Sequence, residues 1–356
     1  MTAAGAEPNA RPRRRPGAST VQDVAAEARV SPMTVSRVLS GAKHVRPELR
    51  ERVERAVLQL GYHRNENARS LRPGQRSGLI GVTITNIANP YYAGLQRGIE
   101  EVASRHERRI LVGNSNEDPA RERQLVADFI GRRVEGLIVV PSGQGSPAHL
   151  RPTALSGVPL VLASRAVPGI DVDTVLVDDV RGAFDATTML LDEGHRRIAF
   201  LGNRVSVFTG QRRFEGFRLA HERAGVTVVG ELVRQGQQDV DSAREAMNGL
   251  LGLHDPPTAV FTANNRNTVG AIRAIMAAGL EGEGGRLGTR VVGFDSFELA
   301  DLSPVPLDLV DHDAGELGRR AAEMLFERLA VGESSAEQAP RLVELPVHLV
   351  RHAGRA

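Results

Sequence analysis

The alternation of short apolar runs with helical stretches limits most strongly how this chain can fold. The apolar runs occupy residues 78–85, 109–115, 136–142, 158–164, 174–179, 197–203, 258–265 and 290–296. Stretches of helical character, such as YYAGLQRGIEEVASR and TVGAIRAIMAAG, separate most of them. An alternation of this kind predicts parallel sheets whose two faces are covered by helices. Because the units extend over roughly 270 residues, we expect an α/β body of two doubly wound lobes.

Polar residues follow many of these apolar runs. They are Thr85-Asn86, Asn114, Ser142, Ser164-Arg165, Asn203, Asn264-Asn265 and Asp295-Ser296. Doubly wound sheets bind their ligands beyond the carboxyl ends of the strands, so the sequence predicts a polar ligand site there. The chain has no cysteine and no phosphate-loop, nucleophile or metal-site motif. We therefore expect a protein that is not an enzyme and that holds neither a cofactor nor a metal.

The segment before this body predicts three short helices. Thr20 and Ser31 are placed to cap the first two, and Pro32 follows in the first turn of the second. An apolar stripe over residues 47–60 predicts the third helix. Two short helices joined by a tight turn, with a third helix after them, are typical of a helix-turn-helix unit that binds DNA.

The second of these helices carries the side chains expected to face DNA. They are Ser31, Pro32, Met33, Thr34, Ser36 and Arg37. The three hydroxyl-bearing residues can bond phosphates and fix the register. Arg37 can donate two hydrogen bonds to a guanine edge.

The charge distribution favours the same assignment. Residues 1–72 hold 14 Lys and Arg against 7 Asp and Glu, a net +7, whereas the other 284 residues hold 31 against 36, a net −5. A basic head on a mildly acidic body suits a protein whose head alone meets a polyanion. Residues 1–18 are expected to be a disordered basic tail. Without an apolar run of 18 residues or a secretory signal, the chain is expected to be cytoplasmic and nucleoid-associated when bound to DNA.

The head also resembles a known family. Asp23-Val24-Ala25, Val30-Ser31 and the run from Thr34 to Leu39 match the D-V-A and V-S-x-x-T-V-S-R-V-L pattern of the lactose-repressor/galactose-repressor (LacI/GalR) regulators. The resemblance implies that residues 19–40 contain the DNA-recognition helix. Arg29 stands in the turn where the family usually has glycine, at a position that often needs positive φ. Pro32 and Met33 occupy the main base-contacting positions, which leaves Arg37 as the chief polar contact.

The linker at residues 63–76 resembles the hinge helix of the same family. The matching residues are Asn65, Ala68, Arg69, Ser70 and Leu71, followed by Arg72. The resemblance implies DNA contacts from Asn65, Ala68, Leu71 and Arg72, with Leu71 inserted into the minor groove. Such a wedge bends the duplex at a cost of a few kcal/mol that added contacts must offset. Because an isolated helix this short is unstable, we expect it to order only in a dimer on DNA.

The resemblance continues to about residue 350, in segments such as RRVEGLIVVPS, GHRRIAFLGN and VVGFDS. It implies a body similar to periplasmic sugar-binding proteins, with an effector in the cleft between the lobes. The effector-binding residues that it implies are Tyr91, Tyr92, Arg213, Gln238, Asn264, Arg266 and Asp295. Asn265 replaces the usual Asp of the family, and Gln238 stands where some relatives have an aromatic residue, which favours hydrogen bonding over ring stacking.

The predicted chain is thus a helix-turn-helix head at 19–62, a linker at 63–76 and an effector-binding and dimerisation body at 77–350. We expect the first lobe to hold residues 77–175 and 308–335, and the second 176–305 and 336–350. The predicted function is that of a homodimeric transcriptional regulator, a repressor, whose affinity for double-stranded operator DNA depends on a sugar or a sugar phosphate. A purine-corepressor regulator of the same family and, more remotely, a solute-binding protein are the alternatives.

Overall fold

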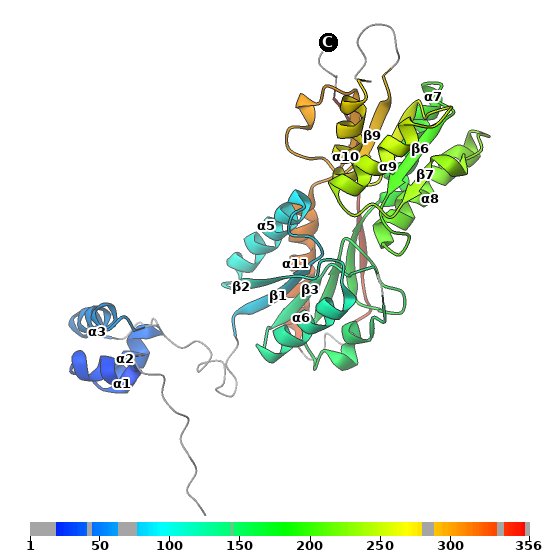
Figure 1. The fold of residues 1–356 in the computed structure, drawn as a ribbon. Coiled ribbons are helices and arrows are strands. Elements are labelled where there is room, and N and C mark those ends of the chain that lie inside the picture. The colour runs from blue at the N-terminus through cyan, green and yellow to red at the C-terminus, as the bar shows by residue number, and fades with distance from the viewer. Residues whose placement is uncertain are drawn as a thin grey trace, which may run out of the picture. The chain divides into compact units, whose positions relative to one another are not determined.

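The computed structural model describes residues 19–40, 45–62, 77–143, 145–279, 288–332 and 338–352 (Figure 1). The chain divides into two compact units, residues 1–75 and residues 76–356, which we call the head and the body. The predicted basic tail and the predicted hinge contacts lie outside the described residues. These hinge residues are Asn65, Ala68, Leu71 and Arg72.

Three helices form the head: α1 (Val21–Glu27), α2 (Pro32–Leu39) and α3 (Pro47–Gln59). The predicted caps are confirmed, because the Thr20 side chain accepts a hydrogen bond from the Asp23 amide and the Ser31 side chain accepts one from the Thr34 amide. The three helices enclose one small apolar core. Its buried side chains are those of Val24, Ala25, Ala28, Val35, Val38, Val53, Ala56 and Tyr62.

The turn between α1 and α2 contains a backbone conformation that glycine usually supplies. Arg29 has a φ of 50°, as its position in the turn predicted. Arg52 of α3 donates hydrogen bonds to the carbonyl oxygens of Ala28 and Arg29, at 2.6 and 3.2 Å. The third helix therefore holds the turn in place while Arg29 carries the steric cost of left-handed backbone.

Replacing Arg29 with glycine is expected to stabilise the head by about 1 kcal/mol, because glycine adopts positive φ without a Cβ clash. The Arg29 carbonyl that Arg52 contacts is kept in the variant. Hydrogen exchange of the head amides in the full-length chain measures the change. Arg29→Ala removes the same charge but keeps the Cβ, so it should bring no gain; an equal gain in both variants would contradict the explanation.

The first lobe of the body is built on a parallel sheet of six strands in the order β11-β5-β4-β3-β1-β2. The strands are β1 (Leu79–Ile84), β2 (Arg109–Asn114), β3 (Gly136–Val139), β4 (Leu160–Ala163), β5 (Asp173–Val177) and β11 (Leu342–Leu345). Helices α5 (Pro90–Arg105) and α11 (Ala314–Val331) cover one face. Helix α6 (Pro119–Gly131) and the short 3₁₀ helices η1 (Ala148–Leu150) and η2 (Pro152–Ala154) belong to the other.

The second lobe repeats this plan with the strand order β12-β10-β9-β8-β6-β7. Its strands are β6 (Ile198–Gly202), β7 (Val233–Gln235), β8 (Ala259–Thr262), β9 (Arg290–Phe294), β10 (Leu307–Asp311) and β12 (His348–His352). Helices α7 (Asp179–Asp192) and α8 (Phe208–Arg223) cover one face, and α9 (Val240–Leu251) and α10 (Asn265–Ala277) the other. The 3₁₀ helices η3 (Gly230–Leu232) and η4 (Ala300–Leu302) complete the lobe. Two doubly wound lobes were predicted, and the body has them.

The described chain passes between the lobes after β5, after β10 and after β11. Two of these passages correct the predicted lobe boundaries. Residues 308–310, assigned to the first lobe, pair with β9 of the second. Residues 342–345, assigned to the second lobe, pair with β5 of the first. The predicted boundaries were wrong because strand pairing, which joins distant segments, decides the lobe to which a strand belongs.

One strand departs from the parallel sheets expected from the sequence. β12 runs antiparallel to β10. The carboxyl ends of the parallel strands in both lobes face the gap between the lobes, and only Pro346 and Val347 separate β11 from β12. The chain therefore keeps its direction as it enters the second lobe, and β12 runs away from the gap. Among the described residues, no helix is long and apolar enough to cross a membrane.

Helices α5 and α11 pack against each other through glycine. A Cβ added at Gly98 would lie 2.0 Å from the carbonyl oxygen of Gly315, and one added at Gly318 would lie 2.1 Å from that of Leu95. Backbone therefore meets backbone, and no side chain fits between the two helices. Because α5 begins at the gap between the lobes and α11 begins just after the passage from β10, this contact fixes the position of both helix starts.

Candidate functional site

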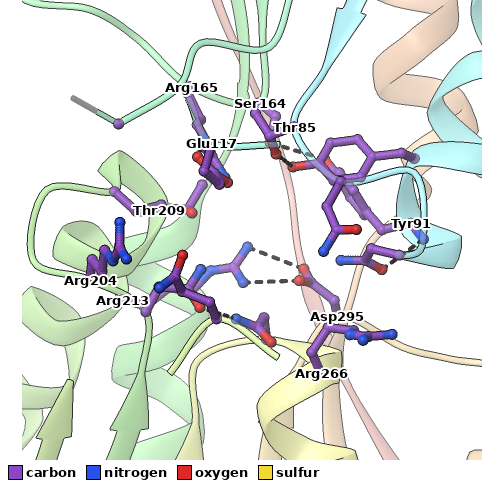
Figure 2. Close-up of a pocket in the computed structure, with 18 of the residues that line it drawn as sticks. Thr85, Tyr91, Glu117, Ser164, Arg165, Arg204, Thr209, Arg213, Arg266 and Asp295 are labelled. Atoms are coloured by element: carbon purple, nitrogen blue, oxygen red, sulfur yellow. Dashed lines mark hydrogen bonds and ion pairs between the residues drawn. The ribbon is translucent and has the colours of Figure 1, made fainter. Parts of the chain in front are cut away.

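A cleft with a volume of ≈780 Å³ lies between the lobes, where the strands of both sheets end (Figure 2). All of the predicted effector residues line the cleft. They are Tyr91, Tyr92, Arg213, Gln238, Asn264, Arg266 and Asp295. The strand-end prediction thus located the cleft, whereas ligand contacts of these residues stay predictions.

Arg213 is the central side chain of the cleft floor. It lies on α8, is 4% exposed, and donates to both carboxylate oxygens of Asp295 at 3.1 Å (Figure 2). Its Nε donates to Asp179 at 2.7 Å, and one terminal nitrogen also donates to the Ala263 carbonyl at 2.6 Å. The guanidinium stacks 3.6 Å from the ring centre of Phe294. Arg213 therefore ties the ends of β8 and β9 to α7 beneath the ligand space.

Asp295 is held as an anion by these contacts. Burial alone raises the pKa of its carboxyl, but the charge of Arg213 and the nearby His312, whose Nε2 lies 3.3 Å from Oδ1, lower it to about 2. Asp179, equally buried behind Arg213, has a pKa that burial raises despite the same arginine. Asp295 is consequently a fixed carboxylate in the cleft, which suits hydroxyl donors.

Two strand-end residues of the cleft have positive φ without being glycine. Asp295, after β9, has a φ of 67°, and Ser164, after β4, has a φ of 66°. Such conformations cost on the order of 1–3 kcal/mol and persist where the surrounding structure enforces them, often at functional sites. Here the strained backbone turns both side chains toward the cleft that they line.

Tyr91 and Tyr92 enter the cleft from the start of α5, where Asn89 caps the helix. The Tyr91 hydroxyl donates to Ser164 Oγ at 3.1 Å, and the Tyr92 hydroxyl lies 2.6 Å from Thr85 Oγ1. Burial raises the pKa of both phenols, so they stay protonated. The edge of the Tyr91 ring meets the Tyr92 ring, with centroids 5.1 Å apart.

The sequence analysis missed a second buried ion pair. Arg165, directly after Ser164, donates to both oxygens of Glu117 at 2.8 and 2.7 Å and to the Pro141 carbonyl. Although burial raises the pKa of Glu117, Arg165 lowers it. The polar strand end at Ser164-Arg165 was the signal for this residue. No such signal marks Glu117 in the sequence, because it lies in a loop after β2 and contacts Arg165 only in the folded chain.

Side chains from α10 join the two lobes beside the cleft. Asn265 donates to Asn89 Oδ1 at 2.8 Å, and Arg266 donates to the Ala88 carbonyl at 3.3 Å. Asn264, which caps α10, donates to Asn203 at 2.5 Å. These contacts give the unusual Asn265 a role in the arrangement of the lobes.

Gln238 contributes hydrogen bonding instead of an aromatic face. With its amide oxygen toward Arg204, it accepts from Nε and a terminal nitrogen at 2.9 and 2.6 Å. Arg204 was not predicted, although it follows the polar strand end at Asn203. Figure 2 shows Arg204 and Thr209 on the side of the cleft away from Tyr91. Thr85 and Asn86 also line the cleft, as expected of polar strand ends, whereas the lining residues Asn89, Gly143, Ser206, Val207 and Thr209 were not predicted.

The recognition helix of the head presents the predicted surface. Met33 is 67% exposed, and Pro32 and Arg37 are exposed as well. Ser31 Oγ already accepts from the Thr34 amide and lies 3.0 Å from Thr34 Oγ1, so both hydroxyls also serve the helix cap. Among the described residues, no group of His, Asp and Glu side chains is arranged to hold a metal ion.

A small helix-turn-helix head followed by a two-lobed body with a polar cleft defines a ligand-controlled DNA-binding protein. The comparisons with known proteins agree. Residues 20–65 match the family model of bacterial regulatory proteins of the lacI family, and residues 77–353 match that of periplasmic binding proteins and the sugar-binding domain of the LacI family. The chain belongs to the LacI family of transcriptional regulators.

Similar proteins span almost the whole chain. Catabolite control protein A of Priestia megaterium is 31% identical over 91% of this chain and 97% of its own. The HTH-type transcriptional regulator GalS of Salmonella typhimurium is 32% identical over 87% and 90%. Among solved structures, a lac repressor dimer bound to operator and the anti-inducer ONPF matches with a TM-score of 0.78 and 26% identity, over 95% of this chain and all of the other. A complex of the transcriptional regulator CelR with cellobiose matches with a TM-score of 0.68 and 29% identity, over 94% and 100%.

Proposed function

We propose that this regulator is a cytoplasmic homodimeric repressor, without catalytic activity, whose operator affinity is set by a sugar or sugar phosphate bound between the lobes. The observation that carries the proposal is the polar cleft built around Arg213 and Asp295. Two of the solved relatives support it: one is a lac repressor dimer bound to operator, and the other is a transcriptional regulator in complex with cellobiose.

The chemistry of the lining favours a sugar over a purine. Aromatic side chains come only from Tyr91 and Tyr92 among the lining residues, and these stand edge to face on one side of the cleft. They form no pair of facing rings between which a planar base stacks. Hydrogen-bonding groups dominate instead, and Asp295 is an ionised acceptor for hydroxyls. The hydrogen-bond partners of Arg204 and Arg266 are neutral, so both positive charges suit the phosphate of a sugar phosphate. The proposal therefore includes phosphorylated sugars.

The contacts between the lobes suggest how a ligand acts on DNA binding. Asn265 to Asn89 and Arg266 to Ala88 link α10 to the loop before α5. A ligand that bridges the lobes changes the balance between arrangements that keep these contacts and arrangements that break them. A differential binding free energy of about 1–3 kcal/mol is enough for a 5–150-fold change in operator affinity.

The proposal is tested with an operator selected from random duplex DNA by the full-length protein. Fluorescence anisotropy then measures binding to that operator with a panel of sugars, sugar phosphates and nucleobases. We expect one sugar or sugar phosphate to change the affinity at least fivefold. A response to a nucleobase alone would overturn the sugar assignment, and the absence of any selected sequence would overturn DNA recognition by the head.

Arg37 supplies a specific prediction on the selected operator. Arg37→Ala is expected to lower affinity about 10–100-fold and to relax specificity at one base pair, because a bidentate contact to guanine contributes about 1–3 kcal/mol. Arg55→Ala, an exposed arginine on α3, removes the same charge and should leave sequence preference unchanged. Binding to the operator and to single-base variants measures both. Unaltered discrimination in Arg37→Ala would remove its base-contacting role.

A further inference from the structure

A second cavity adjoins the effector cleft. It has a volume of ≈920 Å³, and both lobes line it. It shares Gly143, Arg165 and Ser206 with the effector cleft. A Cβ added at Gly143 would lie 2.6 Å from the Ser206 carbonyl oxygen, so any side chain at residue 143 would fill the boundary between the two spaces. The cavity lies beyond Arg165, away from the Arg213–Asp295 pair.

A buried acid–histidine pair forms one wall of this cavity. Glu122, on α6, is 2% exposed, and its Oε1 lies 2.7 Å from His149 Nε2. The other carboxylate oxygen accepts from the Ser142 amide at 2.5 Å. An ionised carboxylate only accepts hydrogen bonds, so Nε2 carries the proton that the pair shares. In the neutral histidine this leaves Nδ1 as an acceptor.

Three buried polar atoms around the cavity have no hydrogen-bond partner among the described residues. They are Ser142 Oγ, His149 Nδ1 and Arg165 Nε. Ser142 is only 8% exposed and Arg165 only 4%. Buried polar atoms are nearly always hydrogen-bonded in folded proteins, because leaving one unsatisfied costs about 1–3 kcal/mol. Ligand hydroxyl groups that bond His149 Nδ1 and Ser142 Oγ would give these two atoms their missing hydrogen bonds.

The rest of the lining combines apolar side chains with the neutral polar residues Ser146, Ser206 and Gln211, and it brings no unpaired carboxylate. Phe208, at the start of α8, contributes an aromatic side chain from the second lobe, and Pro141, Pro147 and Val167 add apolar surface from the first. Arg165 is paired with Glu117 and Glu122 with His149. One wall thus carries polar atoms that can bond hydroxyl groups, and another carries an aromatic side chain. This combination suits a sugar ring, which has polar edges and apolar faces.

We propose that this cavity is a second sugar subsite, so that the effector is a disaccharide or a longer saccharide with its second ring between Ser142, His149 and Phe208. The proposal rests on the proposed function, because the first ring occupies the effector cleft. The second ring is neutral. A monosaccharide fills only the cleft beside Arg213 and therefore binds more weakly.

Titration calorimetry on the full-length protein tests this without any operator. The probes are glucose, cellobiose, maltose, galactose and lactose, each also as its 6-phosphate. We expect one disaccharide to bind at least tenfold more tightly than its constituent monosaccharide. Ser142→Ala should lower the affinity for that disaccharide about three- to tenfold, and Phe208→Ala about tenfold, with the affinity for the monosaccharide unchanged. Val205→Ala, an exposed apolar change in the same loop that lines neither cavity, is the matched control.

The outcomes separate the two proposals. If sugars bind but a disaccharide gains nothing over its monosaccharide, or if Phe208→Ala weakens both alike, the subsite is overturned and the sugar-controlled regulator stands. If no probe binds while the selected operator responds to a nucleobase, the sugar assignment fails and the subsite fails with it.

Discussion

Arg213→Met is expected to lower the free energy of unfolding of the body by about 3–5 kcal/mol, the loss typical when one partner of a buried ion pair is removed. The substitution keeps an unbranched apolar stem but leaves Asp295 and Asp179 buried without their shared cation. It also removes the hydrogen bond to the Ala263 carbonyl at the end of β8. Chemical denaturation followed by circular dichroism measures the loss.

The neighbouring arginine gives a matched control. Arg212 lies next to Arg213 on the same helix and pairs with Glu344, but both side chains of that pair are partly exposed. Arg212→Met should therefore lower stability by no more than about 1 kcal/mol, as expected for a surface pair. Equal losses of stability in the two variants would contradict a stabilising role for the buried network around Arg213.

The role of the Arg213–Asp295 pair in effector binding is tested with a less destabilising substitution. Asp295→Asn keeps the size of the side chain and leaves Arg213 paired with Asp179. We expect this variant to fold and to bind the selected operator, but to respond to effector only at about 10–100-fold higher ligand concentration, because a hydrogen bond to a charged acceptor contributes about 1.5–3 kcal/mol. A normal ligand response in anisotropy would exclude Asp295 from the effector site.

Gly98→Ala is expected to lower stability by about 3 kcal/mol, at the upper end of the usual cost of overpacking. The new methyl group would lie 2.0 Å from the Gly315 carbonyl oxygen and 2.9 Å from the Arg319 amide nitrogen. Both are backbone atoms, so α5 and α11 must separate to accommodate it. Because Tyr91 stands at the start of α5, the variant should also weaken effector binding, which calorimetry with the best sugar probe measures.

The same substitution elsewhere should have the opposite sign. Gly249 lies on the exposed side of α9, and a Cβ added there meets nothing within 4 Å. Gly249→Ala should therefore stabilise the chain by about 0.5–1 kcal/mol, since alanine favours the helix. A loss in Gly249→Ala comparable to that in Gly98→Ala would show that the helix contact is not the cause.

The periodic pattern of the sequence predicted the central strands and the three helices of the head, because both depend on local spacing of apolar residues. Strands β7, β10, β11 and β12 were not predicted. β10 has the sequence LDLVD, and its second residue, Asp308, is buried beside Arg290 of β9. β11 is a four-residue strand whose side chains alternate between exposed and half-buried. A short pattern of this kind does not tell which sheet it joins.

The site, like the fold, was predicted only in part. The polar residues that follow strands were found from position alone. The seven effector residues were implied by the family resemblance, and all of them line one cleft. Their partners were not found, because Asp179 meets Arg213, and Glu117 meets Arg165, only after distant segments fold together. The second cavity likewise depends on Glu122, which on the sequence is one more charge on a helix.

The passage of the chain between lobes has a consequence for synthesis on the ribosome. Helix α11, which covers one face of the first sheet, is made only after β6 to β10 of the second lobe. While residues 178–313 emerge, Ile138, Val161 and Val175 on β3, β4 and β5 lack the cover of α11. This interval lasts on the order of ten seconds at bacterial elongation rates. The head, whose core lies wholly within residues 24–62, needs no later segment. A nascent regulator therefore displays a finished DNA-binding head while its body still requires protection from aggregation.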